Sequence, residues 1–307
     1  MTIPGPQIRI GISGWLYEPW RGVFYPEGLP RKKELHYASH ALNSIEINST
    51  FYSLKRPENF RQWCDQTPEN FVFSIKGSRF ITHIRRLNEI ETPLATFLAQ
   101  GLLQFGSRLG PILWQLPPNF KYDHARLERF FSLLPTTHKQ AALLALAHDP
   151  RLNGRSWTHT GKDRTFRHAI EVRNETFVCE DFVALLRQYN IALVIADTVE
   201  WPLLLDVTSD FIYCRLHGSE QLYTSGYDDP ALDTWAHRIL TWSQGDEVKP
   251  NRSSDQAASQ QRAQFASKHK APKRTSRDVF AYFDNDAKVR APFDAQNLQK
   301  KIFDLLT

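Results

Sequence analysis

Three short apolar stretches of this 307-residue chain each carry two polar residues spaced two positions apart. These pairs are Glu46 and Asn48, Glu171 and Arg173, and Arg215 and His217. Alternate residues of a β-strand point to the same side, so each pair shares one face of its strand. The apolar neighbours need the opposite face for packing, so the pairs must face whatever the strands enclose. Buried charges cost several kcal/mol each unless they are paired, so these residues predict a mixed network of charges.

Further polar and aromatic residues stand at or just after the ends of other apolar stretches. The expected catalytic groups are Glu46, Glu171, His217 and Asp197, which could transfer protons or position a substrate. The expected substrate-binding residues are Asn48, Lys76, Gln115, Arg173, Arg215, Asn285, Trp15 and Tyr52. Within this set, Arg173 and Arg215 are expected to clamp an anion, and Lys76 is expected to pair with Glu46 on the neighbouring strand.

These residue types are compatible with more than one kind of chemistry. The leading hypothesis is an enzyme of hydrolase or lyase type that acts on an anionic small molecule such as a phosphorylated one, with no required cofactor. Alternatively, Glu46, Glu171, Asp197 and His217 bind a divalent metal ion in an isomerase or phosphodiesterase. Only His217 among the histidines stands at a predicted strand end, so no residue is assigned as a metal ligand. The alternative without function is a network that only fixes strand register, with pairs such as Glu171 with Arg215 or Glu46 with Lys76.

Eight apolar stretches bounded by turn residues alternate with helix-like segments along the chain. They cover residues 8–13, 44–48, 71–76, 110–116, 168–173, 192–197, 211–217 and 278–284. Eight parallel strands close a (β/α)8 barrel, which typically needs about 250 residues. The sequence therefore predicts one TIM-type barrel over residues 1–307, with an irregular connection after the sixth strand. The polar strand ends then meet at the C-terminal mouth, where barrel enzymes place their sites.

Charge is distributed unevenly along the chain. The formal net charge is +5, and residues 246–277 alone carry an excess of five positive charges. This segment lies between a helix and a strand, so it is expected to be a flexible basic insertion on the N-terminal face of the barrel, opposite the mouth. A non-catalytic module that binds nucleic acid or another ligand through this segment is a further, weaker hypothesis.

Cysteine usage and the N-terminus indicate the compartment. The three cysteines, Cys64, Cys179 and Cys214, have neither a disulfide pattern nor a zinc-binding spacing. No basic and apolar leader begins the chain, and no stretch reaches the roughly 18 apolar residues of a membrane span. We therefore expect a cytoplasmic protein that does not enter a membrane.

The motifs together resemble the YecE-like family, also called domain of unknown function 72, along nearly the whole chain. They are IGISGW at 10–15, WRG at 20–22, FYP at 24–26, IEINSTFY at 45–52, FSIKG at 73–77, QLPP at 115–118, EVR at 171–173, AD at 196–197, RLHG at 215–218 and YFDND at 282–286. The resemblance implies a TIM-barrel fold and a bacterial protein, without an established activity, substrate or cofactor. Two departures stand out: Asp284 replaces the usual Asn of the last strand, which adds a negative charge at the mouth, and segment 246–277 looks like an insertion.

Overall fold

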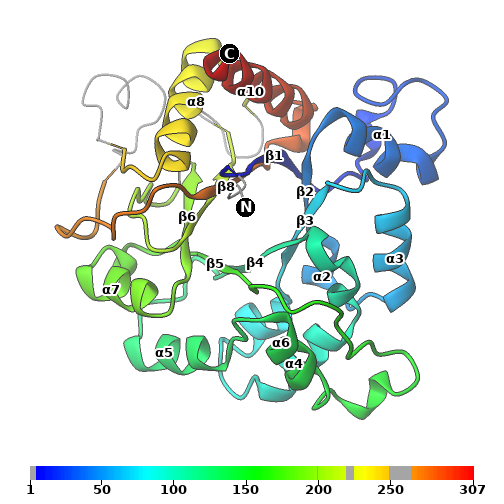
Figure 1. Ribbon diagram of the computed structural model, residues 1–307, viewed down its shortest axis with the longest axis vertical. Coiled ribbons are helices and arrows are strands. Elements are labelled where there is room, and N and C mark those ends of the chain that lie inside the picture. Colours follow the sequence, from blue (N-terminus) through cyan, green and yellow to red (C-terminus); the bar gives the residue numbers. More distant parts are fainter. Residues whose placement is uncertain (1–4, 199, 219–224, 249–263) are drawn as a thin grey trace.

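Eight parallel strands form a closed barrel in the computed structural model, which describes residues 5–198, 200–218, 225–248 and 264–307 (Figure 1). Each strand pairs with the next in sequence, and the last pairs with the first. The strands are β1 (Ile8–Ser13), β2 (Ser44–Ile47), β3 (Val72–Lys76), β4 (Leu109–Gln115), β5 (His168–Glu171), β6 (Ala192–Asp197), β7 (Phe211–Leu216) and β8 (Asp278–Phe283). The predicted (β/α)8 barrel is confirmed, and all eight predicted stretches are strands.

Helices surround the barrel on the outside (Figure 1). They are α1 (Glu34–Ala41), α2 (Ser49–Tyr52), α3 (Pro57–Asp65), α4 (Glu91–Ala99), α5 (His124–Leu133), α6 (His138–Ala145), α7 (Glu180–Gln188), α8 (Asp229–Ser243) and α10 (Ala291–Leu306). Shorter helical turns are η1 (Glu18–Trp20), η2 (Arg31–Lys33), η3 (Phe80–Ile84), η4 (Leu102–Arg108), η5 (Pro150–Leu152), η6 (Glu175–Phe177) and η7 (Asp286–Lys288). Helices α8 and α10 pack against each other beside β8 and β1.

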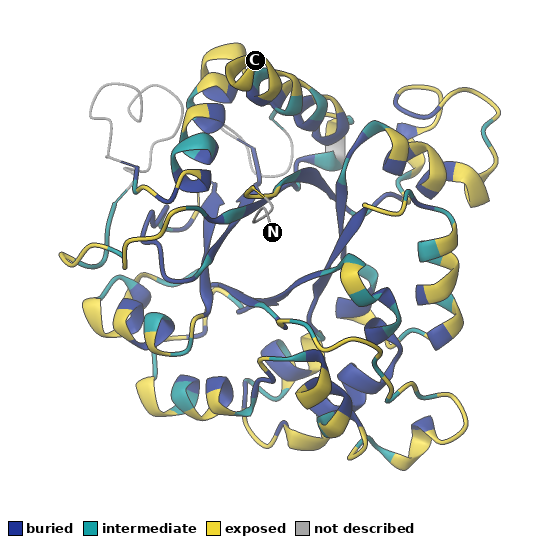
Figure 2. Ribbon diagram, in the orientation of Figure 1, coloured by how far each residue is buried: buried dark blue, intermediate teal, exposed yellow. Residues whose placement is uncertain are grey.

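The strands are buried on both faces, whereas each surrounding helix is buried only on the side toward the barrel (Figure 2). The large apolar core lies between the strands and the helices. A smaller cluster fills the barrel interior, and it includes Val72, Leu113, Val194, Phe211 and Phe280. Strand alternation explains the division, because successive side chains point alternately into the barrel and out toward the helices.

The interior becomes more polar from the start of the strands toward their ends. On β7 the inward-facing residues are Phe211, Tyr213, Arg215 and, just beyond the strand, His217. Between the apolar start of the barrel and the charged strand ends lies a layer of hydroxyl groups. Here the Tyr282 hydroxyl lies 2.7 Å from both Ser44 Oγ and Ser74 Oγ. The ionised groups therefore stand on a layer of hydrogen-bonded hydroxyls, with apolar side chains beneath.

The connection from β6 to β7 is irregular, as predicted. Between Asp197 and Phe211 the described residues contain no helix, and Val199 lies outside them. Part of segment 246–277 packs here: Gln264 pairs with Leu204, and the backbone amides of Ala266 and Ser267 donate to Asp206. Residues 249–263 lie outside the described part of the chain, so a flexible basic insertion, and the nucleic-acid binding that depends on it, stay predictions.

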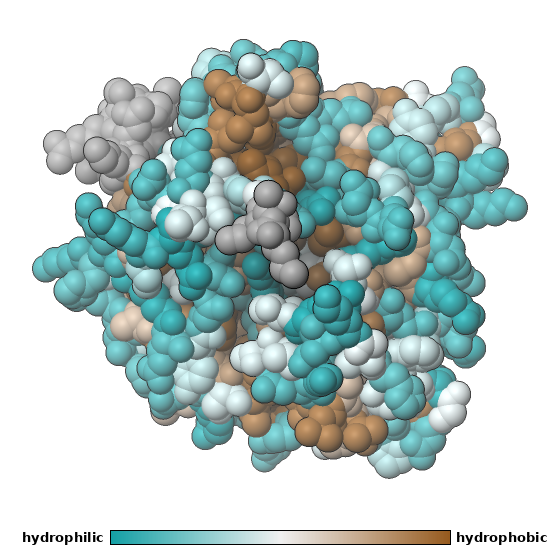
Figure 3. All heavy atoms as spheres, viewed as in Figure 1, coloured by the Kyte–Doolittle hydropathy of each residue, from teal (hydrophilic) through white to brown (hydrophobic). Residues whose placement is uncertain are grey.

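The surface seen down the barrel is mostly hydrophilic, with brown apolar areas of limited size (Figure 3). Within the described residues, no helix is long and apolar enough to cross a bilayer. All three cysteines are free thiols: Cys214 is buried, and Cys64 and Cys179 are partly exposed.

Gly11 permits the close approach of β1 to β2. A Cβ atom at this position would lie 1.9 Å from the backbone oxygen of Ser44. We predict that Gly11→Ala lowers the free energy of unfolding by at least about 3 kcal/mol, because neither backbone can move without breaking the barrel ladder. Urea unfolding measures this, with Gly161→Ala as the control, since no atom lies within 4 Å of the added methyl group there. Equal stability of the two variants would contradict the predicted packing.

Candidate functional site

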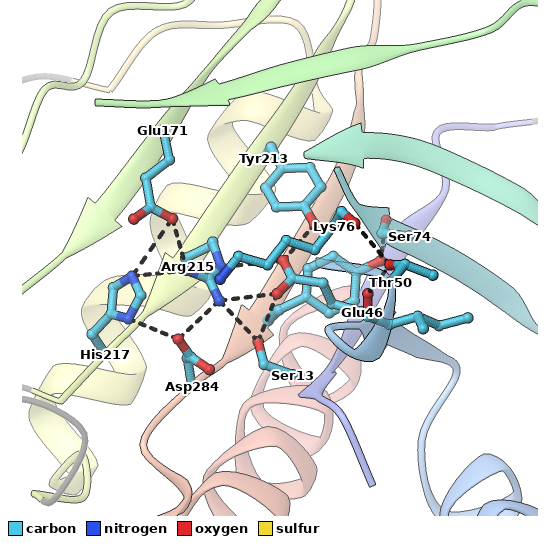
Figure 4. A network of polar contacts seen from close by, with 12 residues as sticks. Ser13, Glu46, Thr50, Ser74, Lys76, Glu171, Tyr213, Arg215, His217 and Asp284 are labelled. Atoms are coloured by element: carbon cyan, nitrogen blue, oxygen red, sulfur yellow. Dashed lines mark hydrogen bonds and ion pairs between the residues drawn. The ribbon is translucent and has the colours of Figure 1, made fainter. Parts of the chain in front are cut away.

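Arg215 lies at the centre of the polar cluster inside the barrel mouth (Figure 4). Its side chain is fully buried, and each of its three nitrogens donates to a carboxylate. Nε and Nη2 donate to Glu46 at 3.1 and 2.9 Å, Nη1 donates to Glu171 at 2.7 Å, and Nη2 also donates to Asp284 at 2.8 Å. The predicted role of Arg215 as a clamp for an external anion is therefore less favoured than a role as the internal counter-ion of three carboxylates.

Glu46 is fully buried and bound on both oxygens. Tyr213 donates its hydroxyl to Oε2 at 2.6 Å, and Ser13 donates to Oε1 at 3.1 Å, in addition to Arg215. The predicted pair of Glu46 with Lys76 is wrong: within the described residues, no ion pair joins them. Arg215 reaches across the barrel from β7 and takes the position beside Glu46 that the neighbouring strand was expected to fill.

Glu171 links the cluster to the rim. Its Oε2 accepts from Arg215, while its Oε1 accepts from Arg173 Nε at 2.7 Å. Arg173 also stacks over the ring of Trp201, with the guanidinium carbon 4.0 Å from the ring centroid. Burial alone would raise the pKa of Glu171, but Arg173 and Arg215, with His217, outweigh it and hold that pKa well below its usual value. Glu171 is thus held as an anion and is a weak candidate for proton transfer.

His217 and Asp284 complete the cluster on the side of β7 and β8. His217 is fully buried, and its Nδ1 lies 3.1 Å from Asp284 Oδ2. Its Nε2 lies 3.9 Å from Glu171, so the ring stands between two carboxylates. Burial would raise the pKa of the Asp284 carboxyl, but Arg215 and His217 hold this pKa below its ordinary value. This position, where the family resemblance implies Asn, carries an ionised group in the present chain.

Among the described residues, Lys76 is a cation of the cluster that is not engaged by a carboxylate. Its side chain is 9% exposed and extends toward Arg215 (Figure 4). Within the described residues no carboxylate oxygen lies within ion-pair distance of Nζ, which instead stands 4.6 Å from the ring centroid of Phe51. Burial and then the charge of Arg215 lower the pKa of Lys76 to about 8, although Asp284, Glu46 and Glu171 act in the opposite direction.

A cationic region extends from Lys76 along the loop after β3. His83 in η3 also packs against Phe51, with ring centroids 5.1 Å apart in an edge-to-face arrangement. Burial, and then the charges of Lys76, Arg173, Arg79 and Arg86, together lower the pKa of His83 to about 4. Arg79 is exposed at the surface. The imidazole is therefore neutral at physiological pH and stands in a positive potential.

An acidic region lies opposite, at the end of β8. Asp286 follows Asp284 by two residues and approaches the hydroxyl of Tyr17. Burial, then the charge of Asp284, raises the pKa of Asp286 to about 6. Two neighbouring carboxyls with pKa values displaced in opposite directions are the arrangement that acid–base sites use. Asp286 can hold a proton near neutral pH while Asp284 stays ionised.

An open cleft of about 580 Å³ adjoins the cluster above β1 and β2. Its walls include Trp15, Tyr17, Asn48, Tyr52, Lys55 and Trp63. Tyr17 connects the cleft to the cluster, because its hydroxyl donates at 2.5 Å to the backbone oxygen of Ser13, whose own hydroxyl donates to Glu46. The Oδ1 atom of Asn48 is buried with no hydrogen-bond partner among the described residues. The predicted substrate-binding residues Trp15, Asn48 and Tyr52 thus share one cleft.

Two predicted site residues lie away from the cluster. Asp197 follows the inward-facing Ala196 and so points out toward α8, where its Oδ2 accepts from Trp235 Nε1 at 3.1 Å. Asn285 follows Asp284 and is fully buried, with its Nδ2 donating to Asp294 at 2.8 Å. Both are displaced by one position from the inward face, and one position reverses the direction of a strand side chain. We therefore no longer place either residue in the site.

Gln115 occupies the expected position at the end of β4. It pairs in register with Glu171 and is 6% exposed. Within the described residues no hydrogen bond of its side-chain amide is recorded, so this group is available at the mouth.

Several contributing residues were absent from the predicted set: Tyr213, Asp284, Asp286, Tyr17, Arg79 and His83. Tyr213 shares the parity of Arg215 on β7, so strand alternation could have identified it. Asp284 directly follows β8 with the parity of Tyr282 and was noted from the sequence only as an added charge at the mouth, whereas Asp286 begins the helical turn η7, where strand alternation gives no guide. His83 lies seven residues after Lys76 in an irregular turn, and no periodic signal marks it.

The metal hypothesis finds no support in the ligand geometry. In the described part of the chain, no group of three or more His, Cys, Asp or Glu side chains is arranged to hold a metal ion. In the cluster the carboxylates are directed at arginine nitrogens.

Comparisons with known proteins agree with this architecture. A family model described as "Protein of unknown function DUF72" matches residues 9–271. The UPF0759 protein YecE of Escherichia coli K12 is 33% identical over 144 residues, which cover 41% of this chain and 50% of YecE. The UPF0759 protein YunF of Bacillus subtilis 168 is 26% identical over 124 residues, which cover 37% of this chain and 41% of YunF. The chain thus spans half or less of the length of the curated relatives it matches.

Solved structures show the same fold. A DUF72 family protein of Thermotoga maritima superposes with a TM-score of 0.71 at 21% identity, covering 97% of this chain and 99% of that one. A DUF72 family protein of Enterococcus faecalis V583 superposes with a TM-score of 0.63 at 16% identity, covering 97% of this chain and 96% of that one.

Removing the central guanidinium should destabilise the barrel in a pH-dependent way. We predict that Arg215→Met lowers the free energy of unfolding at pH 7 by about 3–5 kcal/mol, because it leaves buried carboxylates without a counter-ion. The depressed carboxyl pKa values stabilise the wild type above about pH 4, where the unfolded carboxyls ionise. In the variant the carboxyls bind protons as the pH falls. The loss in free energy of unfolding relative to the wild type should therefore become smaller between pH 7 and about pH 4.

Urea unfolding at the two pH values measures this effect. Arg85→Met is the matched control, because Arg85 and its partner Glu89 are 37% and 82% exposed and their pair should contribute under about 1 kcal/mol. The counter-ion role would be contradicted if Arg215→Met lost no more stability than Arg85→Met, or if its loss of stability did not change with pH.

Removing the Lys76 ammonium should change stability in the opposite direction from removing the Arg215 guanidinium. Its lowered pKa means that the folded state binds the proton less well than the unfolded chain between about pH 8 and 10.5, so stability rises with pH in that interval. We predict that Lys76→Met raises the free energy of unfolding at pH 7 by about 3 kcal/mol and that the gain declines toward zero near pH 10. Lys32→Met, at an exposed position, is the control and should change little. Destabilisation of Lys76→Met at pH 7 would show that the ammonium is a needed counter-ion.

Proposed function

The chain belongs to the DUF72 family of proteins of unknown function, and we propose that it is an enzyme of hydrolase or lyase type acting on an anionic small molecule, such as a phosphorylated one, at the C-terminal mouth of the barrel. The observation that carries the proposal is the cationic region around His83. Lys76 and His83 both pack against Phe51, and the charges of Lys76, Arg173, Arg79 and Arg86 all act on the His83 imidazole by lowering its pKa.

The arrangement supports binding of an anion at this region. Arg79 is exposed, and Lys76 is not occupied by a carboxylate within the described residues. Charge-assisted hydrogen bonds to an ammonium or guanidinium group are about twice as strong as neutral ones, and a phosphate accepts several. Neutral His83 could donate one further hydrogen bond without adding charge.

The acidic region supports proton transfer to the bound molecule. General acids work best when their pKa lies near the operating pH, and the pKa of Asp286 is raised to about 6. Glu46 and Glu171, which the sequence favoured for this role, are saturated by arginine and hydroxyl donors. We therefore assign proton transfer to Asp286, with Asp284 holding His217. The aromatic cleft of Trp15, Tyr17 and Tyr52 would receive the remainder of the substrate.

Calorimetric titration with inorganic phosphate tests the anion site. We predict binding of one phosphate per chain, weakened at least about 10-fold in Lys76→Met and in Arg79→Gln, since each removes a charged hydrogen bond worth about 1.5–3 kcal/mol. Arg129→Gln, an exposed position on α5, is the matched control and should bind phosphate as the wild type does.

The acid–base part has its own readout. Among phosphorylated sugars and organic acids incubated with the protein and followed by mass spectrometry, we expect one to be consumed, and Asp286→Asn should slow this about 100-fold or more while retaining phosphate binding. No phosphate binding, or equal weakening in the Arg129→Gln control, would contradict the proposal.

A further inference from the structure

We propose that Lys76 is an imine-forming lysine, whose Nζ adds to the carbonyl carbon of an anionic aldehyde or ketone held at the barrel mouth. The inference rests on the proposed function, because it identifies the anionic substrate as a carbonyl compound and the reaction as that of a carbon–carbon lyase. It starts from the position of Lys76 at the end of β3, with its side chain directed into the charged cluster rather than into solvent (Figure 4).

The immediate surroundings of Lys76 are unusual for a structural lysine. A buried ammonium that serves structure is normally held by a carboxylate. Here the three nearby carboxylates of Glu46, Glu171 and Asp284 are engaged by arginine, with Arg215 contacting all three. The described neighbour facing Nζ is the ring of Phe51 at 4.6 Å. The charge balance of the cluster is thus carried by arginine, and the amine is left for another use.

The environment also favours the nucleophilic form of the amine. Only a neutral amine has a lone pair that can attack a carbonyl carbon. Burial and the positive charge of Arg215 disfavour the ammonium and bring the pKa of Lys76 to about 8. Near pH 8 about half of the molecules would hold a neutral amine, compared with roughly one in 250 for an ordinary lysine of pKa 10.4. The cation–π contact with Phe51 acts in the other direction but is worth only about 0.5–2 kcal/mol.

The bond changes balance without an external oxidant or reductant. The Nζ lone pair forms a bond to the carbonyl carbon while the carbonyl π electrons move to oxygen, and a proton passes from nitrogen to that oxygen to give a carbinolamine. The hydroxyl then leaves as water with one added proton, for which Asp286 is a candidate donor, and the nitrogen lone pair forms the iminium. In total, amine, carbonyl compound and one proton give iminium and water.

An iminium accepts electrons from the adjacent carbon. When the bond between the α and β carbons breaks, its electron pair forms an enamine and neutralises the nitrogen, while a β-hydroxyl group passes its proton to the Asp286 carboxylate and becomes a carbonyl. The enamine carbon then takes up a proton, and water hydrolyses the resulting iminium to release the second carbonyl product and restore the Lys76 amine. Arg79 and Arg173 would hold the anionic group during these steps. The charges of Glu46, Glu171 and Asp284 favour a positive charge on this nitrogen, although among the described residues none of the three lies within ion-pair distance of it.

Reductive trapping tests the inference on the full-length protein. The probe is glycolaldehyde phosphate with sodium cyanoborohydride near pH 8, and peptide mass spectrometry locates the secondary amine that forms. We expect Lys76 to be modified at least 10-fold faster than the exposed Lys32 and Lys33 of the same molecules, with a rate that saturates with probe and falls when inorganic phosphate is added. Because the comparison is internal, it does not depend on the folding of any variant.

Lys76→Arg keeps a positive charge but lacks the primary amine, so it should bind phosphate and give no fast-modified site. Modification of Lys76 at the rate of Lys32 and Lys33 would overturn the inference. If phosphate binds in the calorimeter but Lys76 reacts slowly, the imine step fails and the anion site stands. If Lys76 reacts fast with uncharged glycolaldehyde and phosphate does not compete, the reactive amine stands and the proposed anion site fails.

Discussion

The guanidinium group of Arg215 contacts Glu46, Glu171 and Asp284 in a part of the barrel from which solvent is excluded. Three carboxylates this close together would repel one another and, without a counter-ion, would have to bind protons. Arg215 satisfies all three because a guanidinium presents donors in several directions from one plane, which an ammonium cannot do. The charge states of the cluster and the geometry of the strand ends that carry it therefore depend on this one side chain.

The interior is arranged in levels that support this interaction. Apolar side chains close the start of the barrel, the hydroxyls of Tyr213 and Tyr282 form the next level, and the ionic contacts come above them. The Tyr213 hydroxyl donates to Glu46 in the ionic level, and the Tyr282 hydroxyl is hydrogen-bonded to Ser44 and Ser74, so these buried polar groups have partners. Arginine neutralises the carboxylates, so among the described residues no carboxylate forms an ion pair with Lys76. Burial and the charge of Arg215 lower the pKa of the Lys76 amine to about 8.

Much of the fold was predictable, since apolar strands, helical periodicity and short connections all indicate the same barrel. Glu46, Glu171, Arg215 and His217 were correctly expected to meet, because the ends of parallel strands share one rim. The pairing of Glu171 with Arg215 was also named from the sequence, whereas the contact of Arg215 with Glu46 was not, because no sequence rule measures that reach across the barrel. Asp197 and Asn285 were wrongly placed in the site. Each follows an inward-facing residue, Ala196 or Asp284, and the alternation of side chains therefore turns it away from the barrel interior. His83 lies in an irregular turn, whose shape only the folded chain defines.

The central claim is that arginine takes the carboxylates of this cluster and leaves Lys76 as an amine of low basicity. Titration of the Lys76 side chain by carbon-13 NMR, with Lys76→Arg used to assign the signal, tests this claim most directly. We expect a midpoint near pH 8, well below those of the exposed lysines. A midpoint at or above the ordinary value of 10.5 would instead show that Lys76 is a permanent counter-ion.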